Sequence, residues 1–441
     1  MNGLINADRG YNPHAYEAKK VLQGVRVKML SADKKEFEVT NNLSFTNLNK
    51  YAQVWKIEAN GEVVEKGSLN LDVAPLSSER FVVPYTTEMD DDKEYFITIE
   101  FRTREAANLL PADYRVAYEQ IALNYYKPVF VPAVTDKTLN VEKTDKEIIV
   151  GNDDFNVAFS LVSGQMTGLS HNGYEFLKND VRPDFWRVKT DNDGWFKEKY
   201  WKTAYQRCHL DTIYTETITE PVKKKKVVKA VKVYAKILIK CNPKPKKEEF
   251  SDAWFNTVYT IYPDATVKVE NDFLPVYYHA ERELSMPRLG QVFEINGELE
   301  EASWYGRGPW ENYADRKTSA LVGRYEMPVK ELAYIYTRPQ ENGYRTDVRE
   351  LKLTSKDGHS MKVTGLQPIC FNAQYAPKEN YEINGKPIRN TIDLKEEKNL
   401  FLNLDYGQMG VGGDNSWGNP VHVDYRVLLR NYRYGFVIQL F

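Results

Sequence analysis

A chain of 441 residues is too long for one ordinary hydrophobic core, so we expect two or three domains. Its 60 basic residues nearly balance its 62 acidic residues, so its charge gives no reason to expect a nucleic-acid or anionic-membrane partner. Aromatic residues make up 13% of the chain, and because aromatic side chains favour strands, the composition predicts an all-β protein.

The cysteines and the apolar runs exclude further classes of protein. Cys208, Cys241 and Cys370 are widely and irregularly spaced, which predicts neither a disulfide framework nor a CxxC metal site. No stretch approaches the roughly 20 apolar residues of a membrane-spanning helix. The first residues also lack the basic and apolar regions of a signal peptide. We therefore expect no membrane partner.

Residues 1–23 do not resemble the start of a domain. Turn-forming residues dominate the first dozen positions, and Pro13 opens a short helical stretch with the sequence HAYEAKKVLQ. Leu4 and Ile5 precede this stretch, and nothing nearby supplies a core for them. We expect this segment to pack on something outside it.

Residues 24–133 predict an immunoglobulin-like β-sandwich. Apolar and polar residues alternate from Val25 onward through roughly seven short segments separated by turn signals. Asn60 and Gly61 form the strongest short hairpin signal, and the alternating stretch from Leu69 to Val73 predicts another strand. Residues 126–136 carry two prolines and no clear period, so we place the linker there.

Residues 137–441 predict a single large two-sheet β-sandwich. The strand pattern runs through this region with hardly a helical window, and no fixed repeat indicates a propeller or a solenoid. Such a domain exceeds the usual size, which calls for many strands rather than two cores. The basic run at 223–226 is typical of a solvated edge strand or hairpin flank, because lysine opposes edge-to-edge pairing.

A glycine-rich stretch at 407–420, with the sequence GQMGVGGDNSWGNP, lies between two alternating segments near the C-terminus. Glycine gives up the most backbone freedom on ordering, so this clustering indicates positive φ angles or a close backbone approach. One interpretation is a hairpin whose Trp417 packs into the core. The other is a presented aromatic face, which is a common platform for a sugar ring.

Carboxylates in other loops of this domain could form a metal site or a catalytic pair. Asp191 and Asp193 could hold a metal or act as acid and base, but short Asp/Asn clusters mostly form turns that satisfy their own backbone. Glu311 and Glu341 could be a glycosidase pair only if their carboxyl groups were about 5 to 5.5 Å apart in space. We expect buried ion pairs that fix the loops instead, formed by Glu311, Asp315, Glu341 and Asp347 with Arg307, Arg316, Arg345 and Arg349.

Several long motifs together resemble the C-terminal domains of glycoside hydrolase family two β-galactosidases. They are FWRVKTDNDGW, WYGRGPWENYADRKTSALVGRYEMPV, RPQENGYRTDVREL and MGVGGDNSWG, and they occur in the expected order. The segment NGLINADRGYNPHAYEAKKV resembles the end of that family's catalytic barrel, and LNLDVAP resembles a strand of the immunoglobulin-like domain after it. The resemblance implies a galactose mutarotase-like fold for the large sandwich.

The resemblance also implies site residues. Trp417 matches the tryptophan that stacks on the substrate at the active-site mouth, with Asp414 and Asn415 beside it. Asn2 matches an asparagine that helps to hold a monovalent cation, although an aromatic residue that shares that site is missing here. A rim loop of the mouth corresponds to Asp191, Asn192, Asp193, Gly194 and Trp195, and this chain departs from the best-known members at Trp195.

By this resemblance the chain is the last part of a retaining β-galactosidase that hydrolyses terminal β-D-galactosides. The catalytic glutamates and a Mg²⁺ site would lie in the missing barrel, so no catalytic residue and no cofactor is expected here, while the parent enzyme would use Mg²⁺ and Na⁺ or K⁺. Expected partners are a galactoside, the barrel and further copies of the enzyme. The resemblance implies a soluble protein of a bacterial cytoplasmic or periplasmic type whose natural N-terminus lies elsewhere.

Two alternatives stay open. A separately encoded, non-catalytic small subunit or carbohydrate-binding module would carry the same residues, and a purely structural module is the third interpretation.

Overall fold

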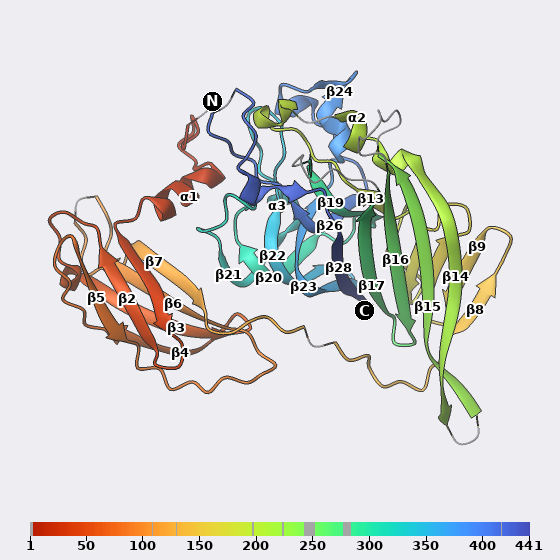
Figure 1. Cartoon of the computed structure of the whole chain (residues 1–441), viewed down its shortest axis with the longest axis horizontal. Coiled ribbons are helices and arrows are strands. Elements are labelled where there is room, and N and C mark those ends of the chain that lie inside the picture. The colour runs from red at the N-terminus through yellow and green to blue at the C-terminus, as the bar shows by residue number, and fades with distance from the viewer. Residues whose placement is uncertain are drawn as a thin grey trace. The chain divides into compact units, whose positions relative to one another are not determined.

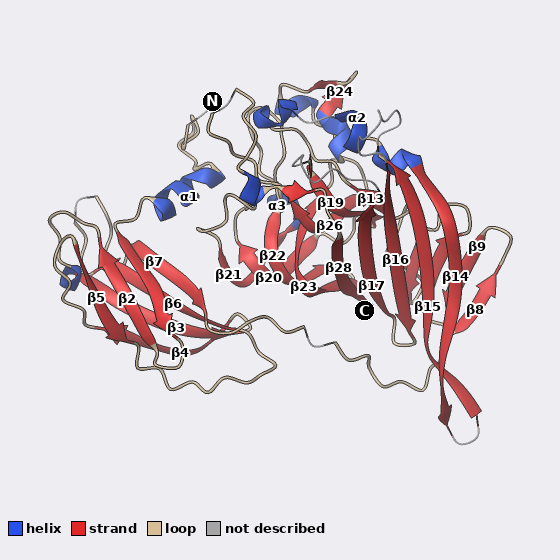
Figure 2. Cartoon of the chain, in the orientation of Figure 1, coloured by secondary structure: helices blue, strands red, loops and turns tan. Residues whose placement is uncertain are grey.

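The computed structural model describes residues 3–107, 109–128, 130–195, 198–222, 225–241, 252–276, 284–415 and 417–441. Strands dominate these ranges and the helices are short, so the all-β prediction is confirmed (Figures 1 and 2). Within the same ranges no helix is both long and apolar enough to cross a bilayer. The chain divides into two compact units, Met1–Val129 with Lys317–Arg324, and Phe130–Arg316 with Tyr325–Phe441.

In its described part, the first unit contains one helix of three turns or fewer, one 3₁₀ turn and a seven-stranded sandwich. One sheet has the order β1-β2-β5 and the other has the order β4-β3-β6-β7. The elements are α1 (Pro13–Val21), β1 (Val25–Ser31), β2 (Glu36–Asn41), η1 (Leu48–Lys50), β3 (Tyr51–Ala59), β4 (Glu62–Leu69), β5 (Ser77–Val82), β6 (Tyr95–Thr103) and β7 (Arg115–Ala122). Phe37, Ile57 and Ile99 face inward from the two sheets and are fully buried in one core. This is the predicted immunoglobulin-like arrangement.

Turn chemistry explains one confirmed strand-pairing prediction, and a side-chain contact explains one that is wrong. Asn60 and Gly61 take φ angles of 47° and 85° and join β3 to β4, as the hairpin signal predicts. The predicted strand from Leu69 to Val73 is absent, since β4 ends at Leu69 and residues 70–76 form no strand. The buried amide of Gln53 replaces the ladder there, accepting from Leu71 N at 2.7 Å and donating to Leu71 O at 2.9 Å.

The second unit contains a very large sheet faced by a smaller one. The large sheet has twelve strands in the described residues, with the order β13-β19-β26-β23-β28-β17-β16-β15-β14, while β20, β21 and β22 extend it from β23. The smaller sheet has the order β12-β11-β10-β9-β8. The strands of the smaller sheet are β8 (Asn140–Lys143), β9 (Glu147–Gly151), β10 (Phe155–Ser160), β11 (Met166–His171) and β12 (Tyr174–Glu175).

The strands of the large sheet are β13 (Arg182–Asp184), β14 (Cys208–Val222), β15 (Lys225–Lys240), β16 (Asp252–Tyr262), β17 (Thr266–Pro275), β19 (Arg288–Ile295), β20 (Glu301–Gly308), β21 (Leu321–Pro328), β22 (Arg345–Thr354), β23 (Ser360–Gln374), β26 (Leu400–Gln408) and β28 (Tyr432–Leu440). Short elements complete the unit: η2 (Asp191–Trp195), α2 (Glu198–Trp201), η3 (Ala204–Arg207), β18 (Ser285–Met286), α3 (Val329–Leu332), η4 (Lys378–Tyr381), β24 (Glu382–Ile383), β25 (Lys386–Pro387), η5 (Thr391–Asp393), η6 (Val423–Tyr425) and β27 (Val427–Leu428).

The two sheets of the second unit enclose one core. Phe159 of β10 meets Tyr259 of β16 with ring centroids 4.8 Å apart, and Val157 and Val233 are fully buried between the sheets. The alternation of apolar residues along β16, from Ala253 onward, places every second side chain in this core. The predicted large two-sheet sandwich is therefore confirmed.

The described part of the basic run belongs to the long β14–β15 hairpin. Lys225 and Lys226 begin β15, which pairs with β14 on one side and β16 on the other, so these two residues lie on a hairpin flank rather than on the edge strand. The edge of the sheet is β14. Lys223 and Lys224 lie outside the described residues.

Candidate functional site

The glycine-rich stretch leaves the large sheet at the end of β26, and a carboxylate fixes its first turn. Asp315 accepts backbone N–H groups from Val411 at 3.0 Å and from Gly412 at 2.7 Å. A Cβ atom on Gly410 would lie 2.4 Å from the carboxyl carbon of Asp315, so only glycine leaves room for this carboxylate. The base of the loop is thus held by hydrogen bonds rather than by a ladder.

The tip of the stretch presents Trp417 to solvent. The side chain is 92% exposed, so the interpretation that it packs into the core is wrong. Asn415 Oδ1 accepts the N–H of Trp417 at 2.9 Å, and Asp414 Oδ1 lies 2.8 Å from His422 Nε2. Gly418 follows with a φ angle of 96°, which turns the chain back sharply. The polar groups beside the tryptophan therefore organise the loop that carries it.

One buried guanidinium joins this loop to the predicted rim loop. Arg187, which follows β13, is 1% exposed. It donates to the carbonyls of Met409 at 2.6 Å and Gly410 at 3.0 Å, and to Gln408 Oε1 at 3.2 Å. It also holds both carboxylate oxygens of Asp193, through Nε at 3.0 Å and Nη2 at 2.7 Å. Such a two-point contact fixes orientation as well as distance.

The rim loop forms the 3₁₀ turn η2, and its residues divide into inner and outer ones. Asp193 is 2% exposed and accepts Thr190 N at 3.0 Å, as expected of a turn-forming aspartate, so its carboxylate faces the protein. Asp191 lies outside and accepts from Arg338 at 3.1 Å. Asn192 Nδ2 would lie 2.8 Å from a Cβ on Gly413, so the rim loop touches the glycine-rich stretch.

Two predicted positions fall outside the described part of the structure. Asn2 lies outside the described residues, and so does the side chain of Trp195. Gly194 has open space around its Cα, so no close contact requires a glycine there.

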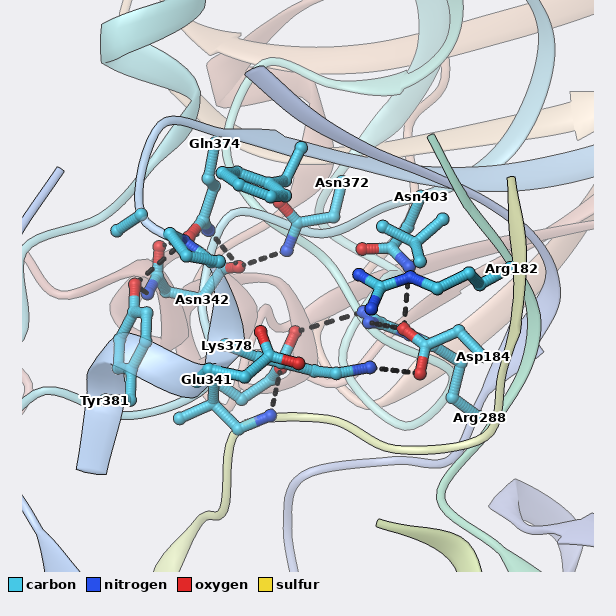
Figure 3. Close-up of a pocket in the computed structure, with 16 residues that line it drawn as sticks. Arg182, Asp184, Arg288, Glu341, Asn342, Asn372, Gln374, Lys378, Tyr381 and Asn403 are labelled. Atoms are coloured by element: carbon cyan, nitrogen blue, oxygen red, sulfur yellow. Dashed lines mark hydrogen bonds and ion pairs between the residues drawn. The ribbon is translucent and has the colours of Figure 1, made fainter. Parts of the chain in front are cut away.

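A cluster of buried charges lies beneath these loops, around the guanidinium of Arg288 at the start of β19 (Figure 3). Its Nε is 3.0 Å from Asp405 Oδ2, its Nη1 is 3.4 Å from Asp184 Oδ2, and its Nη2 is 3.7 Å from Glu341 Oε1. Lys378 pairs with the other carboxylate oxygen, Oδ1, of Asp184. Arg288 and Lys378 thus face three carboxyl groups in a buried region.

Burial and charge act in opposite directions on these carboxyl groups. Burial raises the pKa of Asp405 to about 7, although Arg288 attracts its charged form. Burial likewise raises the pKa of Glu341 against the pull of Arg288 and Arg187. At Asp184 burial also disfavours the charge, but Lys378 and Arg288 outweigh it and hold the pKa of Asp184 below its ordinary value.

The balance of charges agrees with a raised pKa at one carboxyl group of this cluster. The cluster and the adjoining Arg187 pair contain three cations and four carboxyl groups: Arg187, Arg288 and Lys378 against Asp184, Asp193, Glu341 and Asp405. One bound proton makes this set neutral, and an unpaired charge in a buried site is costly. Asp405, whose pKa is raised to about 7, is the group best placed to carry that proton.

The suggested glycosidase pair is tied into loops. Glu311 accepts from Gly343 N at 2.7 Å and forms an ion pair with Arg316. Glu341 accepts from Val188 N at 3.2 Å and from Gln408 Nε2 at 3.1 Å. These contacts agree with the prediction of carboxylates that fix loops.

The arginines of these loops differ in their partners. Arg307 forms an ion pair with Asp347 at 2.6 Å that is only partly buried, whereas Arg345 donates to the carbonyls of Leu332 and Gly343. Across the part of the chain that the structure describes, no group of three or more His, Cys, Asp or Glu side chains is placed to hold a metal ion.

Sequence reasoning found the two loops but missed what holds them. Arg187 stands only six residues before Asp193, yet the backbone carbonyls that it binds, of Met409 and Gly410, lie more than 200 positions later. The one local signal was the Arg-x₅-Asp spacing within FWRVKTDND. Asp315 gave no signal, because its partners are backbone N–H groups in another loop.

Two family models match the chain. The one described as Beta galactosidase small chain matches residues 151–438, and the one described as Beta-galactosidase, domain 4, matches residues 37–124. A β-galactosidase of Priestia megaterium is 32% identical over 99% of this chain, and one of Pseudoalteromonas haloplanktis is 24% identical over 99%. The chain spans only 40% and 42% of those two proteins.

Among solved structures, similar chains include an aldose epimerase homologue from C. elegans and a galactose 1-epimerase from Lactobacillus acidophilus. The first is 10% identical, covers 69% of this chain and 99% of its own, and gives a TM-score of 0.36. The second is 7% identical, covers 69% and 99%, and gives a TM-score of 0.33.

Proposed function

The chain belongs to the β-galactosidase small chain family, and we propose that it forms the C-terminal part of an enzyme that hydrolyses terminal β-D-galactosides with retention. The relatives named above are more than twice as long as the matched region. In this proposal the acid/base and nucleophilic glutamates belong to a barrel domain outside these residues. The carboxyl groups of Asp193, Glu311 and Glu341 are committed to internal contacts, which supports this assignment.

The role proposed for this chain is to complete the mouth of the active site. The observation that carries it is the exposed Trp417 on a loop whose base is fixed by Asp315 and Arg187. A tryptophan side chain has few rotatable bonds, so it loses little conformational entropy when a sugar stacks on it. Asp414 and Asn415 shape the loop around that ring and border the sugar.

The proposal also assigns roles to the rim turn and to the cations of the enzyme. Asp191 and Asn192 form the outer edge of the mouth, while Asp193 anchors that edge from inside. Mg²⁺ and a monovalent cation are assigned to the whole enzyme, with Asn2 contributing to the monovalent site together with barrel residues. In this proposal, no residue of this chain transfers a proton or attacks the substrate.

Complementation tests the proposal. We expect this chain alone to leave a chromogenic β-galactoside intact, and a separately produced barrel fragment to become active when the chain is added. Hydrolysis by the chain alone would contradict the proposal and would direct attention to Glu311, Glu341, Asp191 and Asp193. A mixture that stays inactive, although the two parts bind each other, would contradict it as well.

In the complemented enzyme, Trp417→Ala should raise the KM about three- to tenfold, because a lost stacking contact is a loss of substrate binding. The kcat should change little, since no reacting atom is touched. Trp417→Phe is the matched control and should recover most of the KM. An unchanged KM in Trp417→Ala would refute the stacking role.

A further inference from the structure

We propose that a tyrosine-lined cleft in the second unit binds a neutral, flat aromatic molecule of one or two rings. The cleft is lined by α3 and the segment that follows it, by the end of β23, and by residues in and after η5. About 390 Å³ of it is open to water-sized molecules, whereas a cavity of roughly 150 Å³ already holds a benzene ring. None of the described residues of the stretch 407–420 lines this cleft, so it is separate from the tryptophan loop.

The walls of the cleft present mainly carbon to a ligand. Aromatic rings and aliphatic groups make up most of the lining, among them Tyr334, Ile335, Tyr336, Tyr375, Tyr381 and Leu394. Two of the tyrosine hydroxyl groups are bound to the protein, since Tyr336 donates to Glu311 Oε1 and Tyr375 donates to Gly297 O at 2.9 Å. These two side chains therefore offer a ligand their rings rather than their hydroxyl groups. A mostly apolar lining of this kind is typical of small-molecule sites.

The polar side chains inside the cleft satisfy one another. Gln374 Nε2 donates to Asn342 Oδ1 at 2.8 Å, Asn342 Nδ2 donates to Tyr381 OH at 3.0 Å, and Tyr381 OH donates to Gln374 Oε1 at 3.0 Å (Figure 3). This closed set of bonds leaves little hydrogen-bonding capacity for a ligand. The hydroxyl groups of a sugar would lose water here without gaining new partners, which is costly. The interior therefore disfavours a carbohydrate and favours a ligand that needs few hydrogen bonds.

The charged groups of the cleft balance each other and border its opening. Lys330 and Glu396 are the two charged residues in the described lining, and both are exposed. Lys330 Nζ lies 5.8 Å from the ring centroid of Tyr375. One cation and one anion give no net attraction to a charged ligand. With the exposed hydroxyl group of Thr391, they can serve a single polar substituent that stays near water.

Ring geometry favours an aromatic ligand over an aliphatic one. Tyr334 and Tyr336 already meet edge to face, with ring centroids 4.6 Å apart and an angle of 67° between their planes. Aromatic pairs gain from such contacts in addition to the burial of apolar area, whereas an aliphatic ligand gains from burial alone. A neutral aromatic molecule with one polar group, of which indole is a simple example, is therefore the class that this lining favours.

Saturation-transfer NMR on the complete chain tests this site, with indole as the probe and galactose and cyclohexanol as controls. Indole should bind saturably with a Kd below about 10 mM, the range for a ligand of its size, and both controls should bind at least about fivefold more weakly. Ala333→Phe should weaken indole binding about tenfold or more, because the new ring would occupy the cleft that Ala333 lines. Tyr334→Ala should weaken it about three- to tenfold, since one ring of the wall is lost.

Ile392→Ala is the matched control, because this side chain of η5 is apolar and 91% exposed but does not line the cleft. It should leave indole binding unchanged, and so should Trp417→Ala. Thermal melting of each variant shows whether the fold is kept, and Tyr334→Ala carries the test if Ala333→Phe does not fold.

Indole binding that survives both cleft variants would overturn the proposal. Binding lost in Trp417→Ala, galactose that binds as tightly as indole, or no saturable binding of indole to the unmodified chain would overturn it too. None of these outcomes bears on complementation by a barrel, so the two proposals fail separately.

Discussion

The Arg187–Asp193 pair allows a quantitative test of how the rim is anchored. Asp193→Ala would remove two charge-assisted hydrogen bonds, at 3.0 and 2.7 Å, and the acceptor of Thr190 N. The guanidinium of Arg187 would stay buried, with only neutral carbonyl and amide oxygens as partners. Removing one partner of a buried pair typically costs about 3–5 kcal/mol, because the remaining charge is uncompensated.

This free energy can be converted into a melting temperature. For a unit of roughly 300 residues the entropy of unfolding corresponds to about 0.6 kcal/mol per degree, so a loss of 3 kcal/mol lowers the Tm by about 5 °C. The assay is a thermal melt of the complete chain, followed by circular dichroism, on the transition of the second unit. Asp193→Ala should shift that transition down by about 5 °C or more.

Asp191→Ala is the matched control, since it lies two positions away on the same turn. Its pair with Arg338 is exposed on both sides, with side-chain exposures of 64% and 58%. Exposed pairs contribute about 0–1 kcal/mol, so this change should lower the Tm by less than about 2 °C. Equal shifts in the two variants would refute the idea that Arg187 and Asp193 hold the rim from inside.

Two further changes test neighbouring features. Gly410→Ala should destabilise the chain by about 1–3 kcal/mol, because its Cβ would enter the space of the Asp315 carboxyl group. Gly407→Ala is the control and should be tolerated, since a Cβ there would have nothing within 4 Å. Equal Tm values for the two variants would contradict this crowding. Asp405→Asn should flatten the pH dependence of stability between about pH 4 and 7. The folded pKa of Asp405, about 7, exceeds the ordinary 3.8, so its proton stabilises the fold at low pH and that contribution is lost as the pH rises toward 7. A Tm difference between Asp405→Asn and the unmodified chain that is the same at pH 5 and pH 8 would contradict this sign.

The parts of the fold that could be predicted depend on local rules. The Asn60–Gly61 hairpin follows from two residues that accept positive φ, and the sandwich strands follow from alternation. The same alternation was misleading at Leu69 to Val73, where a side-chain amide from another strand replaced the ladder. Alternation predicts which faces are buried, but it does not determine which backbone groups pair.

Within the candidate site, too, some features could be predicted from the sequence and others could not. The glycine-rich loop and its exposed tryptophan could be located because glycine spacing is itself a backbone signal. The buried cluster around Arg288 could not, since Asp184, Glu341 and Asp405 come from segments that are far apart in the chain. The pKa of Asp405 depends on burial and on Arg288, and neither can be read from neighbouring residues.

The Arg187 contacts also have a consequence for synthesis on the ribosome. Arg187 and Asp193 emerge first, and the acceptors at Gln408, Met409 and Gly410 follow 221 to 223 residues after the arginine. A nascent chain that has not reached β26 can form the ion pair but none of the three bonds that tie it to the tryptophan loop. Until more than 200 further residues have been made, the guanidinium has Asp193 but none of these three acceptors. The rim therefore acquires its final support only after β26 has been synthesised.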